Sequence, residues 1–183
     1  KTRVEKDEQP YARDLEKLSR LLPVFVKEGG TVTAGNASSI NDGAAVLVLG
    51  PYSPLLRPLA RVVAQSSHSR EPAGFPLAPA GAIENVLRRW GVSLDAIDLF
   101  EINEAFAVTT LAVCDMLKLS LDKVNVNGGA VALGHPIGAS GARILVTLLH
   151  ALRARNLRKG IAAICLGGGE AVAMGIEMMK DEG

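Results

Sequence analysis

The sequence predicts an α/β fold in which helices cover both faces of a mixed, mostly five-stranded sheet. Short apolar runs alternate along the chain with segments of helical periodicity, which is typical of α/β proteins. Several of the helical segments are strongly apolar, so they should pack on both sides of the sheet. The last two runs, 160–169 and 170–179, meet at a glycine turn and predict an antiparallel hairpin.

The N-terminal part of the chain predicts one short helix, a loop and a first strand. In DLEKLSRLLP, Asp14 is a plausible N-cap, leucines share one face, and Pro23 ends the helix. Residues 31–43 are small and polar and predict a loop. The run AAVLVLG at 44–50 is apolar without alternation, which is typical of a strand covered on both faces.

The middle of the chain alternates between strands and helices. Residues 58–65 and 98–103 predict two further strands. Residues 79–90 predict an amphipathic helix with Gly91 at the C′ position. Residues 104–117 are apolar nearly all round, so we expect a buried helix there.

Composition excludes several classes of function. Twenty basic and nineteen acidic residues give a net charge of +1, so nothing favours binding to nucleic acid or to an anionic membrane. No apolar run approaches the ~20 residues that span a bilayer. Two cysteines are too few for a disulfide framework, which indicates a reducing compartment. The chain begins without Met, and we expect it to be a piece of a larger protein.

The stretch GGAVALGHPIGASGAR at 128–143 surrounds one histidine with glycines. Pro136 suits the first position of a helix because it fixes φ and lacks an N–H, so His135 is expected at the helix N-terminus. The helix dipole there disfavours an imidazolium by ~0.3–1 kcal/mol and at most ~2 kcal/mol. A neutral imidazole can accept a proton or donate its N–H to an oxyanion. A histidine packed in the core beside a capped helix explains the stretch equally well.

Two other positions are candidates for chemistry. Asn103 ends a predicted strand and opens a helix, where α/β proteins place ligands, although a capping role explains it too. Cys165 also ends a strand, and the N–H groups of the three glycines after it could line an anion site. Packing alone would also explain Cys165. Cys114 lies inside an apolar helix and is expected to be inert.

Four motifs together resemble the thiolase family: TVTAGNASSINDGAA (31–45), NEAFA (103–107), NVNGGAVALGHPIGASG (125–141) and GIAAICLGGGEAVA (160–173). They occur in the family's order, and the likeness runs from about residue 7 to the end. The resemblance implies a thiolase-like C-terminal half. It also implies the Claisen condensation of two acetyl-CoA molecules to acetoacetyl-CoA and the reverse thiolysis, as in acetyl-CoA C-acetyltransferases.

The resemblance implies four catalytic positions. His135 would activate the nucleophilic thiol and donate to the thioester oxyanion, and Asn103 would hold a water that completes this oxyanion hole. Cys165 would be the acid/base that serves the substrate α-carbon or the incoming thiol. Gly167 would lend its N–H to a second oxyanion hole for the acyl-enzyme. Each preorganised donor of this kind is worth ~10²–10³ in rate.

The resemblance also implies substrate contacts. Ser38 and Ala34 match positions that touch the pantetheine arm of coenzyme A, and Phe25 is expected to line the same channel. Phe75, together with Ala105, is expected at the acyl pocket. The pair Phe75-Pro76 is similar to mitochondrial-type acetoacetyl-CoA thiolases, which use potassium and can admit a 2-methyl branch.

No cofactor is implied, because the coenzyme A thioester is the substrate. A potassium ion held through backbone carbonyl groups, with that of Val131 as one donor, stays open. The family's nucleophilic cysteine lies in its N-terminal half and has no counterpart here. We therefore expect the chain alone to be inactive, an N-terminal thiolase half as partner, and a homo-oligomer. Residues 1–40 would end the coenzyme A-binding loop region and 41–183 would form the C-terminal core domain.

Three alternatives stay open at this point. A 3-ketoacyl-CoA thiolase of β-oxidation would act on longer substrates. A non-catalytic coenzyme A-binding subunit would explain the missing nucleophile and the short connection GPYSPLLR at 50–57. A condensing synthase of related fold is disfavoured, because synthases usually place other residues at Asn103 and Cys165. We expect a cytoplasmic protein, with the mitochondrial matrix as the alternative, because MMKDEG is not a peroxisomal address.

Overall fold

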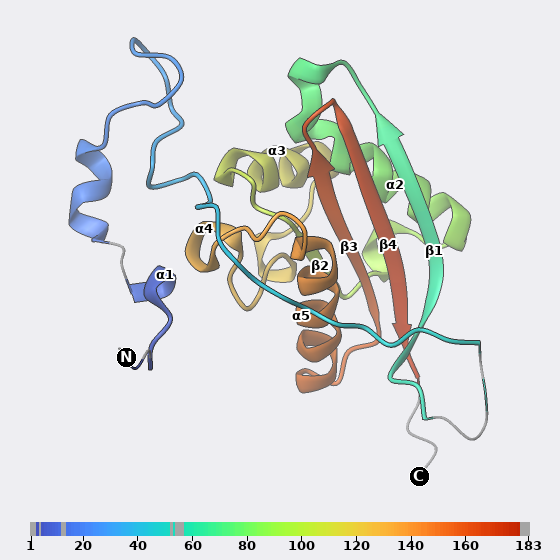
Figure 1. The fold of residues 1–183 in the computed structure, drawn as a ribbon. Coiled ribbons are helices and arrows are strands. Elements are labelled where there is room, and N and C mark those ends of the chain that lie inside the picture. Colours follow the sequence, from blue (N-terminus) through green and yellow to red (C-terminus); the bar gives the residue numbers. More distant parts are fainter. Residues whose placement is uncertain (1–2, 4, 12–13, 52, 54–56, 180–183) are drawn as a thin grey trace.

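One mixed sheet organises the chain in the computed structural model, which describes residues 3, 5–11, 14–51, 53 and 57–179 (Figure 1). In this part of the chain the sheet has four strands, in the order β1 (Ala60–Ser69), β4 (Glu170–Met178), β3 (Lys159–Leu166) and β2 (Leu99–Ile102). β4 is antiparallel to both of its neighbours, whereas β2 runs parallel to β3. The predicted α/β class and the C-terminal hairpin are confirmed.

Helices cover both faces of the sheet, as the sequence predicts. Helices α2 (Ala78–Trp90) and α3 (Ala107–Leu117) enclose one apolar cluster, and α5 (Ser140–Ala154) encloses a second one on the other face (Figure 1). β3 alternates between the two clusters, because successive side chains of a strand point to opposite faces. Ile161 therefore packs in the first cluster and Ala162 in the second.

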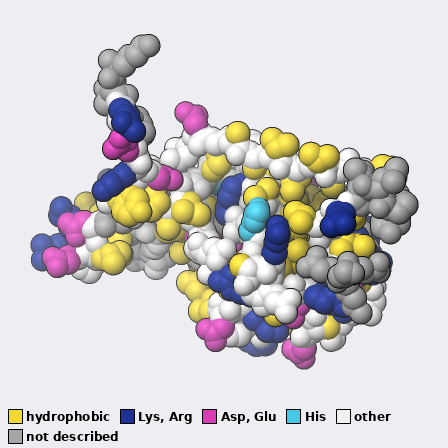
Figure 2. Space-filling view, turned by 90° about the horizontal axis from the view of Figure 1, so that it is seen from below, with side chains coloured by type: hydrophobic (Ala, Val, Ile, Leu, Met, Phe, Trp, Pro, Cys, Tyr) yellow, Lys and Arg dark blue, Asp and Glu magenta, His cyan; other side chains and the backbone are white. Residues whose placement is uncertain are grey.

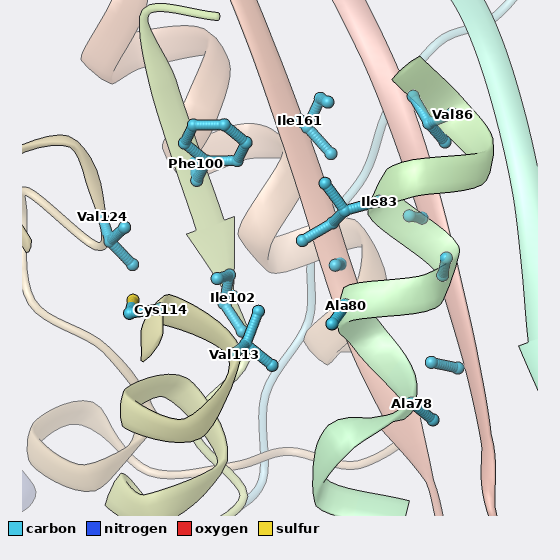
Figure 3. Packing of buried hydrophobic residues seen from close by; sticks show 14 of the residues in the cluster. Ala78, Ala80, Ile83, Val86, Phe100, Ile102, Val113, Cys114, Val124 and Ile161 are labelled. Carbon is cyan, nitrogen blue, oxygen red and sulfur yellow. The ribbon is translucent and has the colours of Figure 1, made fainter. Parts of the chain in front are cut away.

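Cys114 packs in the first apolar cluster. Figure 3 shows this side chain near Val124 and Ile102, within the cluster of buried hydrophobic residues. Burial raises the pKa of the Cys114 thiol, so the thiol stays protonated and packs as a small apolar side chain.

Short helical elements make up the rest of the described chain. Their bounds are α1 Glu8–Tyr11, η1 Leu15–Arg20, η2 Pro72–Leu77, η3 Leu94–Ala96, η4 Leu121–Lys123 and α4 Ala130–Leu133. The predicted cap of η1 is confirmed, because the Asp14 carboxylate accepts a hydrogen bond from the N–H of Glu16 at 3.1 Å. Gly91 ends α2 at a φ of 74°, also as predicted. No helix among the described residues is long and apolar enough to cross a membrane.

Two predictions about local structure are wrong. The run 44–50 is not a strand: it has no ladder partner, and Val46, Val48 and Leu49 are exposed. A strand needs a neighbour to pair with, and the four-stranded sheet does not extend to this segment. Helix α3 is only half buried, because Val108, Leu111 and Met116 are exposed on its outer face. Part of the connection 50–57 and the last four residues, 180–183, lie outside the described residues.

Candidate active site

Asn103 lies at the carboxyl end of β2, where the sequence predicts it. Its N–H donates to the carbonyl oxygen of Ala163 at 2.9 Å, which continues the parallel pairing of β2 with β3 by one residue. Residues i and i+2 of a strand share a face, so Asn103 lies on the same face as Glu101, toward α5. The Asn103 side chain is 1% exposed, and its amide therefore requires hydrogen-bond partners within the protein.

His135 does not begin a helix, contrary to the prediction. Helix α5 begins at Ser140, and the N–H groups of Ala139 and Ser140 both donate to the carbonyl oxygen of Pro136 in a turn before it. The backbone of His135 is instead held by a distant segment. Its N–H donates to the Ser39 carbonyl oxygen at 2.8 Å, beside an isolated parallel bridge with Ile40.

Two hydrogen bonds orient the imidazole of His135. Its Nδ1 lies 2.6 Å from Ser140 Oγ, and its Nε2 lies 3.3 Å from Asn103 Nδ2. The Ser140 hydroxyl donates its one proton to the Pro136 carbonyl oxygen at 3.0 Å, so it accepts from Nδ1–H. This assignment leaves Nε2 with a free lone pair that accepts from the Asn103 amide. The arrangement presents Nε2 as a proton acceptor.

The charge state of His135 agrees with the prediction, but its cause differs. Burial lowers the pKa of the imidazole, and the positive charge of Arg143 lowers it further. The predicted helix dipole cannot supply this effect, since α5 begins five residues after His135. The neutral form is therefore favoured by the surroundings of the ring rather than by the helix terminus.

A buried ion pair lies behind the asparagine. Arg143 Nη1 lies 3.8 Å from Glu101 Oε2, and Arg143 Nη2 donates to Asn103 Oδ1 at 3.5 Å. Burial raises the pKa of Glu101 to about 7, Arg143 opposes that shift, and the negative charge of Glu104 adds to it. Near neutral pH the Glu101 carboxyl is therefore divided between its charged and neutral forms.

Glu104 fixes the glycine-rich loop that carries His135. Its two carboxylate oxygens accept from Val131 N–H and from Asn125 Nδ2, each at 3.0 Å. Gly129 makes this contact possible, because a Cβ at that position would collide with the Glu104 carboxylate. Gly134, which precedes the histidine, has a φ of 94° and lies against Asn41, so a side chain there would be both strained and obstructed.

Cys165 lies at the same edge of the sheet but is not joined to the pair. It is the penultimate residue of β3, two positions beyond the Ala163 that binds Asn103. The side chain is 8% exposed, and burial raises the pKa of its thiol, an effect that a backbone hydrogen bond partly opposes. Among the described residues no hydrogen bond connects Cys165 with His135 or Asn103. Gly167 follows in the hairpin turn, with open space around the position that a Cβ would take.

The residues predicted to touch the substrate gather near α3. Ser38 donates from both its N–H and its hydroxyl to the Ala105 carbonyl oxygen, at 3.2 and 2.9 Å. Phe25 and Phe75 each make an edge contact with Phe106, with ring centroids 5.9 and 6.3 Å apart. Ala34 lies in the turn that precedes this contact, at 34–36. The two phenylalanines are therefore linked through a third ring.

Five residues that shape the site are not expected from the sequence motifs: Glu101, Glu104, Phe106, Ser140 and Arg143. Period-two alternation with Asn103 was a usable indication for Glu101, and the spacing of three between Ser140 and Arg143 places both on one face of α5. No cluster of three or more His, Cys, Asp or Glu side chains that could hold a metal occurs within the described ranges.

Comparison with known proteins identifies the family. The family model "Thiolase, C-terminal domain" matches residues 56–178, and "Thiolase, N-terminal domain" matches residues 1–53. The chain belongs to the thiolase family. The C-terminal match alone covers more than half of this thiolase chain, and the expectation that the motifs raised is confirmed.

Relatives agree with this assignment. The chain is 48% identical over 182 residues to the cytosolic acetyl-CoA acetyltransferase of Rattus norvegicus, covering 96% of the chain and 46% of that protein. It resembles the crystal structure of the Bacillus anthracis acetyl-CoA acetyltransferase with a TM-score of 0.90 and 50% identity, covering 98% of the chain and 48% of that one. A thiolase of Ascaris suum in complex with coenzyme A matches with a TM-score of 0.84 and 46% identity, covering 96% and 47%. The chain thus spans less than half the length of these relatives.

Proposed function

We propose that this chain is the C-terminal catalytic half of an acetyl-CoA acetyltransferase, which joins two acetyl-CoA molecules and catalyses the reverse thiolysis. The observation that carries the proposal is the partly buried contact of 3.3 Å between Asn103 Nδ2 and His135 Nε2. A neutral imidazole beside a fixed amide N–H supplies one proton acceptor and one donor in the same place. The names of the relatives support acetyl-CoA as the substrate class.

The chemistry begins at His135. Nε2 accepts the proton of a nucleophilic cysteine thiol that the N-terminal thiolase portion supplies, and the thiolate attacks the carbonyl carbon. An acyl-cysteine forms as the bond from the acyl carbon to the sulfur of coenzyme A breaks in the synthetic direction, and the departing coenzyme A thiolate takes its proton from the Cys165 thiol. This divides one difficult transfer into two easier steps. The resulting imidazolium and a water held by Asn103 then donate to the thioester oxygen of the second acetyl-CoA as its enolate forms.

Cys165 serves the α-carbon. Because burial raises its pKa, the thiol is protonated at neutral pH and can give its proton to the acetyl-CoA enolate that leaves during thiolysis. In condensation the Cys165 thiolate that remains after coenzyme A has taken the thiol proton removes a proton from the methyl group of the second acetyl-CoA. Gly167 donates its N–H to the oxygen of the acyl-cysteine. Cys165 and Gly167 both belong to the hairpin of β3 and β4, which therefore supplies the second half of the site.

Substrate contacts are proposed around Phe106. Ser38 and Ala34 would hold the pantetheine arm, with Phe25 along the same channel. Phe75 and Ala105 would close the acyl pocket, and their proximity to α3 supports this placement. A potassium ion near the backbone of Val131 remains part of the proposal, and thiolysis rates with potassium or sodium chloride at equal ionic strength test it.

Apolar surface on the chain supports the proposal that a partner covers it. The extended run 44–50 exposes apolar side chains, and a hollow of about 450 Å³ lies between α5 and the face of β4, lined by Ile144, Leu145, Ile164 and Met174 among others. Figure 2 shows hydrophobic side chains lying between Lys and Arg on the surface seen from below. We propose that the N-terminal thiolase portion covers these surfaces and that complete subunits form a homo-oligomer. The cytosolic relative supports a cytoplasmic location.

Thiolysis of acetoacetyl-CoA by the chain together with the N-terminal thiolase portion tests the proposal. His135→Ala should lower kcat by ~10²–10⁴, as expected for loss of a general base. His150→Ala, at an exposed position of α5, is the matched control and should keep the wild-type rate. Equal rates for His135→Ala and the control would refute the proposed role. Coenzyme A binding without any turnover by the unaltered protein would favour the non-catalytic subunit, and faster thiolysis of longer 3-ketoacyl-CoA substrates would favour the β-oxidation enzyme.

A further inference from the structure

Arg143 is a largely buried cation whose charge is poorly compensated. Its side chain on α5 is 19% exposed, and its only carboxylate contact within 4 Å among the described residues is the one of 3.8 Å to Glu101. Its Nε and Nη1 atoms are buried and have no hydrogen-bond partner in the part of the chain that the structure describes. Burying a guanidinium with so little pairing is costly, so a merely structural ion pair does not account for the arrangement.

The remaining nitrogen of the guanidinium determines how Asn103 is oriented. Arg143 Nη2 donates to Asn103 Oδ1 at 3.5 Å, and the other end of the same amide, Nδ2, faces His135 Nε2 at 3.3 Å. Rotating the amide by half a turn would place Nδ2–H against the guanidinium donors and Oδ1 against the lone pair of Nε2. Both contacts would then be repulsive. A positive charge at Oδ1 therefore favours one of the two amide orientations.

We propose that Arg143 is a positioning residue that acts through Asn103: it holds the amide so that its N–H faces the imidazole and so that the amide can hold the water that donates to the reacting thioester oxygen. Arg143 itself touches neither substrate nor the reacting atoms. This role rests on the proposed function, because it assigns to Arg143 the preorganisation that the first oxyanion hole requires. The charged groups around the amide are Arg143 from α5, Glu101 from β2 and Glu104 from the loop after β2.

The geometry also determines which substitution is informative. Arg143→Met keeps most of the apolar stem and removes the charge and the donor to Oδ1. It leaves Glu101 in the core without its cation, and that carboxyl, with a pKa already near 7, can take up a proton. The double variant Glu101→Gln, Arg143→Met removes both charges together. Arg153→Gln, on the same helix at an exposed position, is the matched control.

Steady-state thiolysis of acetoacetyl-CoA, measured on the protein together with the N-terminal thiolase portion, tests the proposal. We expect Arg143→Met and the double variant to lower kcat by about 10², the scale of one preorganised donor, and to change KM less than threefold. Arg153→Gln should leave both unchanged. In an Asn103→Ala background, Arg143→Met should lower kcat less than threefold further, since the amide on which it acts is absent.

The outcomes separate the two proposals. If Asn103→Ala lowers kcat but Arg143→Met and the double variant do not, the positioning role is refuted and the proposed function stands. If the losses from Asn103→Ala and Arg143→Met multiply, Arg143 acts independently of the amide and the inference is wrong. If Arg143→Met and the double variant both lose the cooperative fold, the side chain is structural and the inference is also wrong. If neither His135→Ala nor Asn103→Ala affects kcat, the proposed function fails and the inference fails with it.

Discussion

Replacing Ser140 with alanine removes the group that determines which ring nitrogen of His135 carries the proton. Ser140 is fully buried, and its hydroxyl connects the Pro136 carbonyl oxygen with His135 Nδ1. In Ser140→Ala the Nδ1–H has no acceptor at that place. The imidazole must then either keep an unpaired buried proton or move it to Nε2, where it would face the N–H of Asn103.

The structure limits the size of the effect. The Pro136 carbonyl oxygen keeps two backbone donors, Ala139 N–H and Ser140 N–H, each at 2.8 Å, so only the imidazole is left unpaired. One buried group without a partner costs ~1–3 kcal/mol, and we expect a decrease of that size in the free energy of unfolding. The same change should shift the ratio of the two neutral tautomers by about tenfold toward Nε2–H, since 1.4 kcal/mol corresponds to a factor of ten.

Two measurements test this prediction. Urea unfolding gives the free energy of unfolding, and ¹⁵N NMR of selectively labelled histidine reports the tautomer of His135. Ser93→Ala is the matched control, because Ser93 is exposed and caps η3 without a side-chain hydrogen bond. Wild-type stability together with an unchanged Nδ1–H tautomer in Ser140→Ala would show that the hydroxyl does not orient the ring.

Two further predictions concern the carboxylates near the site. Between pH 4.5 and about 7, folded Glu101 keeps a proton that the unfolded chain has lost, so this group lowers stability as the pH rises, by up to roughly 3 kcal/mol. Glu101→Gln should remove that decline in urea unfolding compared at pH 5 and pH 8, and identical slopes for both proteins would contradict the assigned pKa. Gly129→Ala should displace Glu104 from Val131 and Asn125 and cost ~1–3 kcal/mol on unfolding, the scale of overpacking. Gly141→Ala is the control, because Gly141 lies in α5 with open space around the added methyl group, and its free energy of unfolding should rise by ~0.5–1 kcal/mol. The steric argument would be refuted if Gly129→Ala lost less stability than an alanine substitution at any exposed glycine.

Local sequence patterns predicted most of the fold, because most elements are specified by their own periodicity. Helix α2 shows this best: its apolar stripe, its bounds within one residue and the glycine at its end were all readable. The run 44–50 could not be placed in the same way. Its apolar residues suit a strand, but a strand also needs a neighbouring strand to pair with. Whether that neighbour exists depends on the rest of the fold and not on the segment itself.

The candidate site, like the fold, could be predicted only where local sequence patterns mark its residues. Asn103 and His135 could be selected because glycines, proline and a strand end mark them locally, and the structure brings them together. Arg143 and Ser140 were read only as part of a helix, because their role comes from contacts across 40 and 5 residues of sequence, respectively. The neutral state of His135 was predicted for the wrong reason, since the position of a helix start depends on backbone hydrogen bonds that Pro136 alone does not determine.

The anchoring of His135 has a consequence for how the protein can be divided. The carbonyl that holds the histidine backbone belongs to Ser39, and residues 1–53 match the N-terminal family model, whereas the imidazole belongs to the C-terminal one. A truncation at the border between the two family models would therefore remove the hydrogen bond that Ser39 accepts from the backbone of His135. The position of the imidazole thus depends on residues from both matched regions, and a C-terminal piece that is expressed or exchanged separately should include Ser39.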